Sequence, residues 1–337
     1  MDIVVCGAQV PFMRGGAELH MDNLVAALNA AGHRADLVKI PTAWDRERLL
    51  DSALAWRLLP IDADLVIATN FPSYFVQHPR KVVWLFHQHR PAYDLVDTTW
   101  SDFGSDDASL EAQRLLVDWD TTALEEARQV FTTSKLVASR LERFNGMASE
   151  PLYHPPPLFD RLHEGPFGDY VCCATRLEGN KRPLLLANAM HYVEPPTQMV
   201  LAGKGHLDAE LRALLVSREL EDRVSTPGFV SDDDLVELFA GAFAVVYAPI
   251  EEDYGYVTLQ AFRAGKPVIT TEDSGGVLEW VEDGVTGLVT ENSPEALGAA
   301  IESLSNDRDL ARRMGAEARD RVATLSWGPV VDKLVAR

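Results

Sequence analysis

The stretch from Ala242 to Gly276 restricts the possible folds of this chain more than any other part of it. Residues 242–248 are apolar and rich in β-branched side chains, which predicts a buried strand that Pro249 ends. An acidic loop follows, and Val257–Ala264 is predicted to form a helix closed by the next glycine. A strand, a loop and a helix in this order are typical of an α/β fold.

A second strand is predicted directly after that helix, over Pro267–Thr271. Two loops, Glu251–Tyr256 and Asp273–Gly276, would then leave the same edge of a parallel sheet. Open α/β sheets bind their ligands at this edge, where the carboxyl ends of the strands lie. The sequence therefore predicts a binding site formed by these two loops.

The same alternation runs through the rest of the chain and predicts doubly wound parallel sheets. Further strands are predicted over residues 2–8, 35–40, 65–69, 81–86, 130–134, 170–175, 198–202, 224–225 and 288–290. Further helices are predicted over residues 17–31, 46–58, 135–145 and 307–323, and helices are also predicted to begin at residues 183, 232 and 294. Ser231 is predicted to cap the helix that begins at residue 232.

The length of 337 residues suits two domains better than one core. The run His154-Pro-Pro-Pro157 favours a stiff extended connector, because proline cannot join a helix or a central strand. We place the boundary between Leu158 and Gly168, with domains over 1–160 and 161–324.

Composition excludes several classes of function. Formal charge is 31 minus 51, or -20, which argues against binding to nucleic acid and against a polybasic grip on anionic lipid. No apolar run approaches the ~20 residues that span a bilayer. Cys6, Cys172 and Cys173 lie in predicted buried strands without metal-ligand spacing, which indicates reduced thiols and a cytoplasmic protein.

Two further segments have the residue types that bind phosphate. Arg14-Gly-Gly-Ala-Glu18 follows the first strand, and glycines at a helix N-terminus let backbone N–H groups approach an anion. Arg176 and Lys181 flank a loop that enters a helix, so the two cations can converge on a diphosphate. Taken alone, such a glycine pair or cation pair more often belongs to an ordinary turn or surface loop.

The segment from Glu252 to Gly276 resembles the signature of the family 4 (group 1) glycosyltransferases of the two-domain GT-B architecture. That signature has an acidic residue, a Phe/Tyr-Gly pair, a second Glu, a Gly-x-Pro-Val strand and a Gly-Gly loop. The first Glu matches Glu252, whereas the position of the second is Gln260 in this chain. The resemblance covers nearly the whole chain and is weakest over residues 91–122.

The resemblance implies two Rossmann-like domains facing each other across a cleft, with a final helix at about 325–337 packing on the first domain. It implies catalytic roles for Arg176 and Lys181 on the donor diphosphate, for Glu252 on the donor-sugar hydroxyls, and for His87 beside the donor sugar or acceptor. It implies donor binding by Gly15, Gly16, Gly228, Phe229, Asp253, Tyr254, Gly255, Tyr256, Val257, Gln260, Ser274, Gly275 and Gly276.

The implied activity is a retaining, metal-independent, hexosyltransferase-type transfer from a UDP-, GDP- or dTDP-sugar to an acceptor hydroxyl. The nucleotide-sugar is a substrate, so no cofactor and no metal site are expected, and membrane contact is expected to be peripheral at most. In the family, the Glu at the position of Gln260 accepts hydrogen bonds from the ribose. A Gln there would suit a deoxyribose donor such as a dTDP-sugar.

Two alternatives remain open from the sequence. The chain could be a non-catalytic partner subunit that keeps the fold, with Gln260 as a sign of lost activity, or a nucleotide-sugar epimerase of the same architecture. Residues 91–122 fit either an acceptor loop or a solvated surface helix with a few anchoring aromatic side chains.

Overall fold

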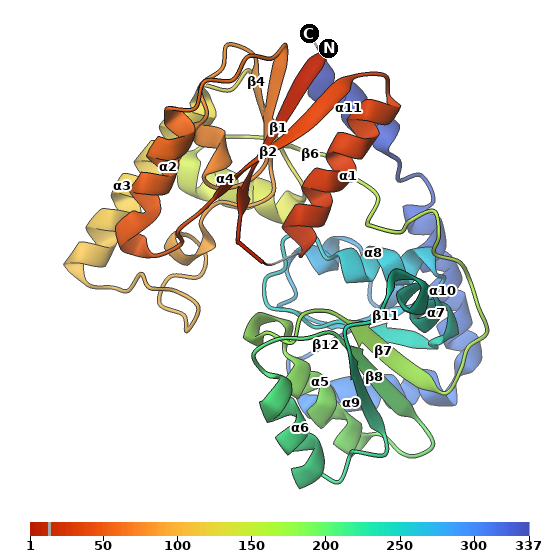
Figure 1. The fold of residues 1–337 in the computed structure, drawn as a ribbon. Helices are drawn as coiled ribbons and strands as arrows, with labels where there is room; N and C mark the ends of the chain where they lie inside the picture. The colour runs from red at the N-terminus through yellow and green to blue at the C-terminus, as the bar shows by residue number, and fades with distance from the viewer. Residues whose placement is uncertain (13–14, 337) are drawn as a thin grey trace. The chain divides into compact units, whose positions relative to one another are not determined.

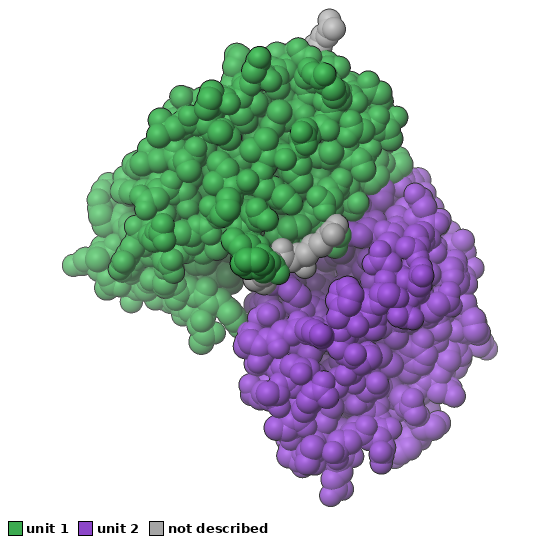
Figure 2. Space-filling view, viewed as in Figure 1, with its two compact units in different colours: residues 1–154, 326–337 green, residues 155–325 purple. Residues whose placement is uncertain are grey.

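The computed structural model describes residues 1–12 and 15–336. The chain forms two compact units (Figure 2): unit 1 contains Met1–His154 and Ser326–Arg337, and unit 2 contains Pro155–Leu325. Unit 1 ends inside the proline run, six residues before the boundary predicted at residue 160.

Unit 1 is a six-stranded parallel sheet with helices on both faces (Figure 1), in the strand order β2-β1-β3-β4-β5-β6. Its strands are β1 (Asp2–Gln9), β2 (Arg34–Pro41), β3 (Leu65–Ala68), β4 (Lys81–Leu85), β5 (Gln129–Thr132) and β6 (Glu150–Pro151). Its helices are α1 (Gly16–Ala30), α2 (Leu49–Arg57), α3 (Asp107–Glu125), α4 (Lys135–Asn145) and α11 (Trp327–Val335), with short 3₁₀ turns η1 (Arg46–Arg48), η2 (Ser73–Phe75) and η3 (Arg90–Ala92).

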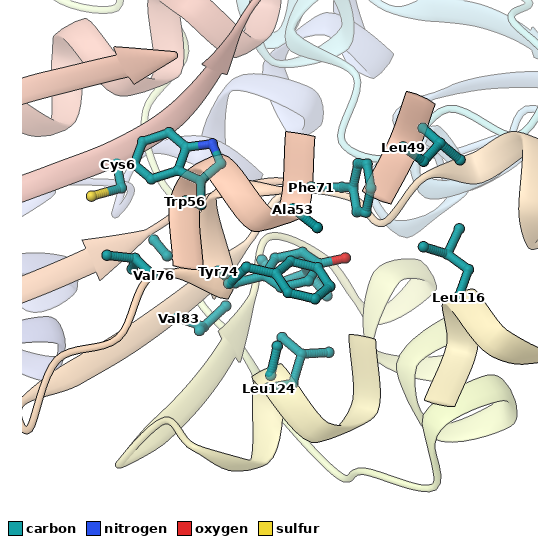
Figure 3. Close-up of a cluster of buried hydrophobic side chains, with 14 of the residues drawn as sticks. Cys6, Leu49, Ala53, Trp56, Phe71, Tyr74, Val76, Val83, Leu116 and Leu124 are labelled. Atoms are coloured by element: carbon teal, nitrogen blue, oxygen red, sulfur yellow. The ribbon is translucent and has the colours of Figure 1, made fainter. Parts of the chain in front are cut away.

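Strand residues of unit 1 alternate between two cores, as the twofold period of a strand requires. Val66 and Val83 belong to the core that α2, α3 and α4 cover; Trp56 and Tyr74 lie in it (Figure 3). Leu65, Ile67, Val82 and Trp84 face the other core, which α1 and α11 cover side by side (Figure 1). The last helix of the chain is therefore part of the first unit.

Unit 2 is a second six-stranded parallel sheet, in the order β12-β11-β10-β7-β8-β9. Its strands are β7 (Tyr170–Ala174), β8 (Gln198–Ala202), β9 (Val224–Gly228), β10 (Ala244–Val246), β11 (Val268–Thr271) and β12 (Gly287–Thr290). Its helices are α5 (Pro183–Ala189), α6 (Asp208–Ser217), α7 (Asp232–Gly241), α8 (Tyr256–Arg263), α9 (Pro294–Asn306) and α10 (Arg308–Val322), with 3₁₀ turns η4 (Gly179–Lys181), η5 (Met190–Tyr192) and η6 (Gly276–Glu279).

Both sheets confirm the predicted doubly wound α/β class. Several elements differ from the sequence-based expectation. β10 has three residues, although the apolar run extends over seven, because Tyr247 and Ala248 continue beyond the ladder as buried loop. α6 and the short strand β6 were not predicted, and the second half of the segment 91–122 forms α3. That helix agrees with the surface-helix interpretation of this segment.

Each sheet has one reversal point, at which the order of its strands changes direction, and a ligand is expected there. In unit 2 the order reverses between β7 and β10, and in unit 1 between β1 and β3. Ligands of open α/β sheets bind at the carboxyl ends of the strands beside such a point. The loops after β7 and β10 contain Arg176, Lys181 and Glu252, so three predicted catalytic residues lie at the reversal point of unit 2.

Candidate functional site

Three loops at the carboxyl edge of the unit 2 sheet are joined by backbone hydrogen bonds. Ile250 N donates to Asn180 O (2.9 Å), which joins the loop after β10 to the loop after β7. Glu251 N donates to Asp273 O (2.9 Å), and Gly276 N to Glu252 O (2.6 Å), which joins it to the loop after β11. The loop after β10 is therefore fixed from both sides.

Lys181 and Glu252 form an ion pair at the centre of these loops. The Lys181 ammonium also lies 3.3 Å from the hydroxyl of Tyr247, a buried residue at the end of β10. Burial first and the Glu252 carboxylate second raise the pKa of the Tyr247 phenol well above its usual value, so the phenol is neutral. Lys181, which was predicted to bind the donor diphosphate, thus directly contacts Glu252, which was predicted to bind the donor-sugar hydroxyls.

Arg176 differs from Lys181 in being exposed, and it forms no hydrogen bond or ion pair through its side chain with the described residues. Lys204, in the loop after β8, is exposed as well. The two loops are neighbours, because Leu177 N donates to Lys204 O (3.0 Å) and Leu207 N to Leu177 O (3.1 Å). Arg176 is accordingly a guanidinium available to an anion at the reversal point.

Arg182 is a charged residue at this edge of the sheet that the sequence reasoning missed. Its guanidinium forms a two-point ion pair with Asp273 and lies 3.5 Å from Ala248 O. Hydrogen bonds from Arg182, ahead of its charge, hold the pKa of Asp273 below its usual value. Its local sequence, between Lys181 and a proline that starts α5, gave no signal of this partner, which is 91 residues away in the chain.

Ser274, Gly275 and Gly276, which the resemblance implies as donor-binding residues, lie in the loop after β11. The segment leads into η6, a four-residue 3₁₀ turn, and the Gly276 N–H already donates to Glu252 O. Ser274 is fully buried, and its hydroxyl bonds to the hydroxyls of Thr270 (2.8 Å) and Thr271 (3.0 Å). These residues support the Glu252 loop.

Close packing explains the glycine at position 275. A Cβ atom there would come within 2.7 Å of Glu252 N, and Gly275 has φ +63. Only glycine combines this conformation with such a close approach. The Gly-Gly pair therefore sets the distance between the two loops.

The start of α8 holds the rest of the predicted donor-binding cluster. Gly255, with φ +81, is the N-cap, and a Cβ atom there would come within 2.9 Å of the Val277 side chain. Asp253, Tyr254 and Val257 are buried beside it, and the Tyr254 ring contacts that of Tyr256 (5.6 Å between centroids). These side chains pack at the start of α8.

Gln260 lies on α8 one turn after Tyr256 and is buried. Its side-chain Nε2 donates to the backbone oxygen of Pro157 (3.1 Å), a residue in the connector at the start of unit 2. The sequence identified Gln260 as a departure from the signature but gave no indication of this partner.

Gly228 ends β9, and Phe229 follows it at the same edge of the sheet. Gly228 has φ +78, and its carbonyl accepts from Gly203 N (2.8 Å). The Phe229 side chain is 78% exposed, which is unusual for an aromatic residue without a covering element. An exposed ring at this position offers a flat apolar surface to a ligand.

In unit 1 the glycine pair lies at the start of α1, after β1. Gly15 N donates to Glu18 Oε2 (2.9 Å), whereas Gly16 is exposed and its N–H has no partner among residues 1–12 and 15–336. Arg14 of the same motif lies outside the described residues. Among the described residues, Gly16 thus offers the unpaired N–H that an anion site requires.

His87 lies just after β4, as predicted, and is half-buried with Nδ1 2.8 Å from Gln88 O. The neighbouring His89 is buried among the rings of Trp44, Phe71 and Phe103. Burial lowers the pKa of His89 to about 4, so this imidazole is neutral at pH 7. His87 is therefore the more accessible of the two histidines.

Within the described part of the chain, no group of three or more His, Cys, Asp and Glu side chains has the arrangement that holds a metal ion. Residues 1–12 and 15–336 also contain no helix with the length and apolar character needed to cross a bilayer. The three cysteines are free and buried.

Several curated proteins resemble parts of this chain. The alpha-D-kanosaminyltransferase of Streptomyces kanamyceticus is 33% identical over 123 residues, which are 36% of this chain and 31% of that protein. A GDP-mannose-dependent alpha-(1-6)-phosphatidylinositol monomannoside mannosyltransferase of Mycobacterium tuberculosis is 33% identical over 186 residues, 52% of this chain and 47% of that protein. The matched regions span less than half of these relatives.

Solved structures resemble the whole chain. Sucrose-phosphate synthase from Thermosynechococcus elongatus has a TM-score of 0.79 at 20% identity, over 99% of this chain and 97% of that one. HepE of Anabaena in complex with UDP-glucose has a TM-score of 0.74 at 18% identity, over 99% and 98%. The family model described as "Glycosyl transferases group 1" matches residues 165–321. This segment therefore matches the group 1 glycosyl transferases, in a chain whose fold resembles these solved structures over almost its whole length.

Proposed function

We propose that the chain is a hexosyltransferase-type glycosyltransferase that moves a sugar from a nucleotide-diphosphate-sugar to an acceptor hydroxyl. The observation that carries this proposal is Arg176, an exposed guanidinium without an ion-pair partner among the described residues, beside the Lys181–Glu252 pair at the reversal point of unit 2. A similar structure that contains UDP-glucose and a relative named as GDP-mannose-dependent support this type of donor.

In the proposed reaction, Arg176 binds the diphosphate through a two-point guanidinium contact. Lys181 lies within reach of the same group and shares its charge between the phosphate and Glu252. The fixed Glu252 carboxylate accepts hydrogen bonds from donor-sugar hydroxyls. Cations placed in advance lower the barrier because they stabilise the negative charge that develops on the departing diphosphate.

We further propose a retaining, metal-independent mechanism of the family 4 type. The bond between the anomeric carbon and the diphosphate oxygen breaks, and its electron pair stays on the diphosphate. The acceptor oxygen bonds to the anomeric carbon from the same face, and its proton passes to the departing phosphate oxygen. The proposal therefore needs no protein base, and the nucleotide-sugar is a substrate, so no cofactor is included.

The acceptor is proposed to be a hydroxyl compound other than nucleic acid, because the net charge is -20. Any membrane contact is proposed to be peripheral. The free, buried cysteines support a reducing compartment and hence a cytoplasmic location.

The first test measures thermal stability against UDP, GDP, ADP and dTDP with a chelator present. A ligand at about 100 times its dissociation constant adds about 2.7 kcal/mol to the free energy of unfolding. We expect one nucleotide to raise the melting temperature, and Arg176→Ala to abolish the shift. Arg218→Ala is the matched control, since Arg218 is an exposed arginine after α6, at the other end of that helix from the loops of the site.

An equal loss of the shift in both arginine variants would contradict the assigned role of Arg176. If none of the four nucleotides raises the melting temperature of the unaltered protein, donor binding is wrong. Gln260 would then support the alternative of a non-catalytic partner subunit. For a protein that binds donor, the anomeric configuration of the product, read by NMR, tests retention.

A further inference from the structure

Three side chains on and just after α8 donate to three backbone oxygens of the connector. Gln260 Nε2 lies 3.1 Å from Pro157 O, Arg263 Nε 3.0 Å from Phe159 O, and Lys266 Nζ 3.0 Å from Gly165 O. The three donors are spaced three residues apart, so they occupy one side of the helix and its exit. We call residues 157–165 the connector segment.

Cation–π contacts of the same side chains accompany two of these hydrogen bonds. The Arg263 guanidinium lies 4.9 Å from the centroid of the Phe159 ring, and the Lys266 ammonium lies 3.9 Å from that of the Phe167 ring. Burial lowers the pKa of Lys266 to about 8, so this ammonium remains mostly charged at pH 7. The connector segment is thus attached to α8 along its length.

The contact at Gln260 depends on an amide. A carbonyl oxygen only accepts hydrogen bonds, so the amide nitrogen of Gln260 must face Pro157 O. A carboxylate has no hydrogen to donate and would place a negative charge against the Pro157 oxygen. The same position cannot serve this contact with an ionised glutamate.

The helix transmits this attachment to the donor loop. α8 has eight residues and begins directly after the Glu252–Gly255 loop, and Gln260 is one turn from its first residue. A helix with intact hydrogen bonds moves as a unit, so fixing Gln260 also restricts Glu252 relative to the connector segment.

We propose that Gln260 is a positioning residue that ties the connector segment to α8, and that it is not a ligand of the nucleotide ribose. The part of this proposal that concerns the nucleotide rests on the proposed function, whereas the attachment of the connector segment to α8 does not. The Pro157 carbonyl accepts from the Gln260 amide nitrogen, and this contact holds the Glu252 loop in place through α8.

The decisive variant is Gln260→Glu, with Gln260→Met as a second variant that keeps the side-chain length and removes the donor. We expect both to lower the melting temperature of the ligand-free protein by about 2–4 °C at about pH 7.5. In Gln260→Glu only, the deficit shrinks as the pH falls toward about 4.5, because a protonated carboxyl group donates to Pro157 O. Its folded pKa is raised, so the stability that it contributes is lost as the pH rises.

Hydrogen exchange reports on the connector directly. Arg161 N and Leu162 N donate to Leu158 O inside the connector segment. We expect a peptide that spans these amides to exchange faster in both Gln260 variants. Gln113→Glu is the matched control, because Gln113 Nε2 donates to Ala92 O (2.9 Å) in unit 1. It should lower the melting temperature without altering exchange in the connector.

The donor arm compares the dissociation constants of UDP and 2′-deoxy-UDP by calorimetry. We expect both Gln260 variants to weaken the two nucleotides by the same factor, roughly three- to tenfold, with the ratio between them unchanged. A preference of the unaltered protein for UDP over 2′-deoxy-UDP that Gln260→Met abolishes would overturn the proposal, and so would unchanged stability and exchange in both variants. If the unaltered protein binds neither nucleotide, the proposed function fails. The pH dependence of the melting temperature and the hydrogen exchange still test whether Gln260 attaches the connector segment to α8.

Discussion

Asp120 is a carboxyl group that the fold of unit 1 keeps away from water. It lies on α3 with no exposed surface, and the Tyr93 hydroxyl donates to its Oδ2 (2.6 Å). Burial raises the pKa of Asp120 to about 7, and the hydrogen bond from Tyr93 opposes that rise. The carboxyl group therefore titrates near neutral pH.

Replacing Asp120 by asparagine should make the stability of unit 1 less dependent on pH. A raised pKa means that the folded state loses stability as the pH rises from about 4 to about 7. Between these two pH values, we expect the free energy of unfolding of Asp120→Asn to rise by on the order of 3 kcal/mol relative to that of the unaltered protein. Urea titrations at several pH values measure the difference. Asp118 is exposed on the same helix, so the stability of Asp118→Asn should depend on pH as that of the unaltered protein does. If the stability of all three proteins depends on pH in the same way, Asp120 does not have the raised pKa assigned to it.

Single residues show where sequence reasoning ends. The positions of Arg176, Lys181 and Glu252 at one sheet edge followed from the order of strands and loops, and the structure brings these loops together. The Lys181–Glu252 ion pair and the contact between Gln260 and Pro157 did not follow. Both join residues that are far apart in the chain, and a sequence pattern carries no distance between such residues.

Among the helices, α7 shows a start that the sequence encodes locally. Its N-cap Ser231 accepts from Asp234 N (3.1 Å), as predicted, and Asp232–Asp234 lie in the first turn, where the helix dipole favours negative charge. α4 likewise ends at Gly146 in the left-handed conformation. Such boundaries are predictable because they depend on neighbouring residues alone.

Ser231→Ala should cost about 1 kcal/mol of stability in unit 2, because one N–H group of the first turn loses its acceptor. Chemical denaturation and hydrogen exchange in α7 measure the loss. Ser217→Ala is a matched control: its hydroxyl donates to Leu214 O near the end of α6, and no helix N–H depends on it. An equal loss in both variants would show that Ser231 does not act as a cap.

Elements that depend on tertiary packing were predicted less well. The glycine pair after β11 has the residues of a helix start, but the Gly276 N–H is bound by Glu252 O from another loop. The apolar run at residues 242–248 has seven residues, whereas β10 has only three, since the last residues of the run are buried in the loop. In each case a distant partner determines the backbone.

The whole chain crosses between its units twice, because α11 returns to unit 1 after the end of unit 2. Val330, Val331 and Leu334 belong to the same core as Leu24 and Trp84. The core of unit 1 is therefore completed by residues that follow all of unit 2 in the sequence.

Leu334→Ala should destabilise unit 1 by about 2–4 kcal/mol, because it leaves a cavity in a closed core. Hydrogen exchange in β1 should increase while exchange in β7 stays the same. Leu58→Ala, at a leucine that is 78% exposed, should cost less than about 0.5 kcal/mol. Faster exchange in β7 but not in β1 would contradict the assignment of α11 to unit 1.

The late return of α11 has a consequence for synthesis on the ribosome. The face of the first sheet that contains Leu24 and Trp84 is made early, but its cover is made only after residues 155–325. At translation rates of roughly 5–20 residues per second, this apolar face waits about 10–30 s for α11. During that time the nascent chain presents a binding surface for chaperones, although the finished protein has covered it.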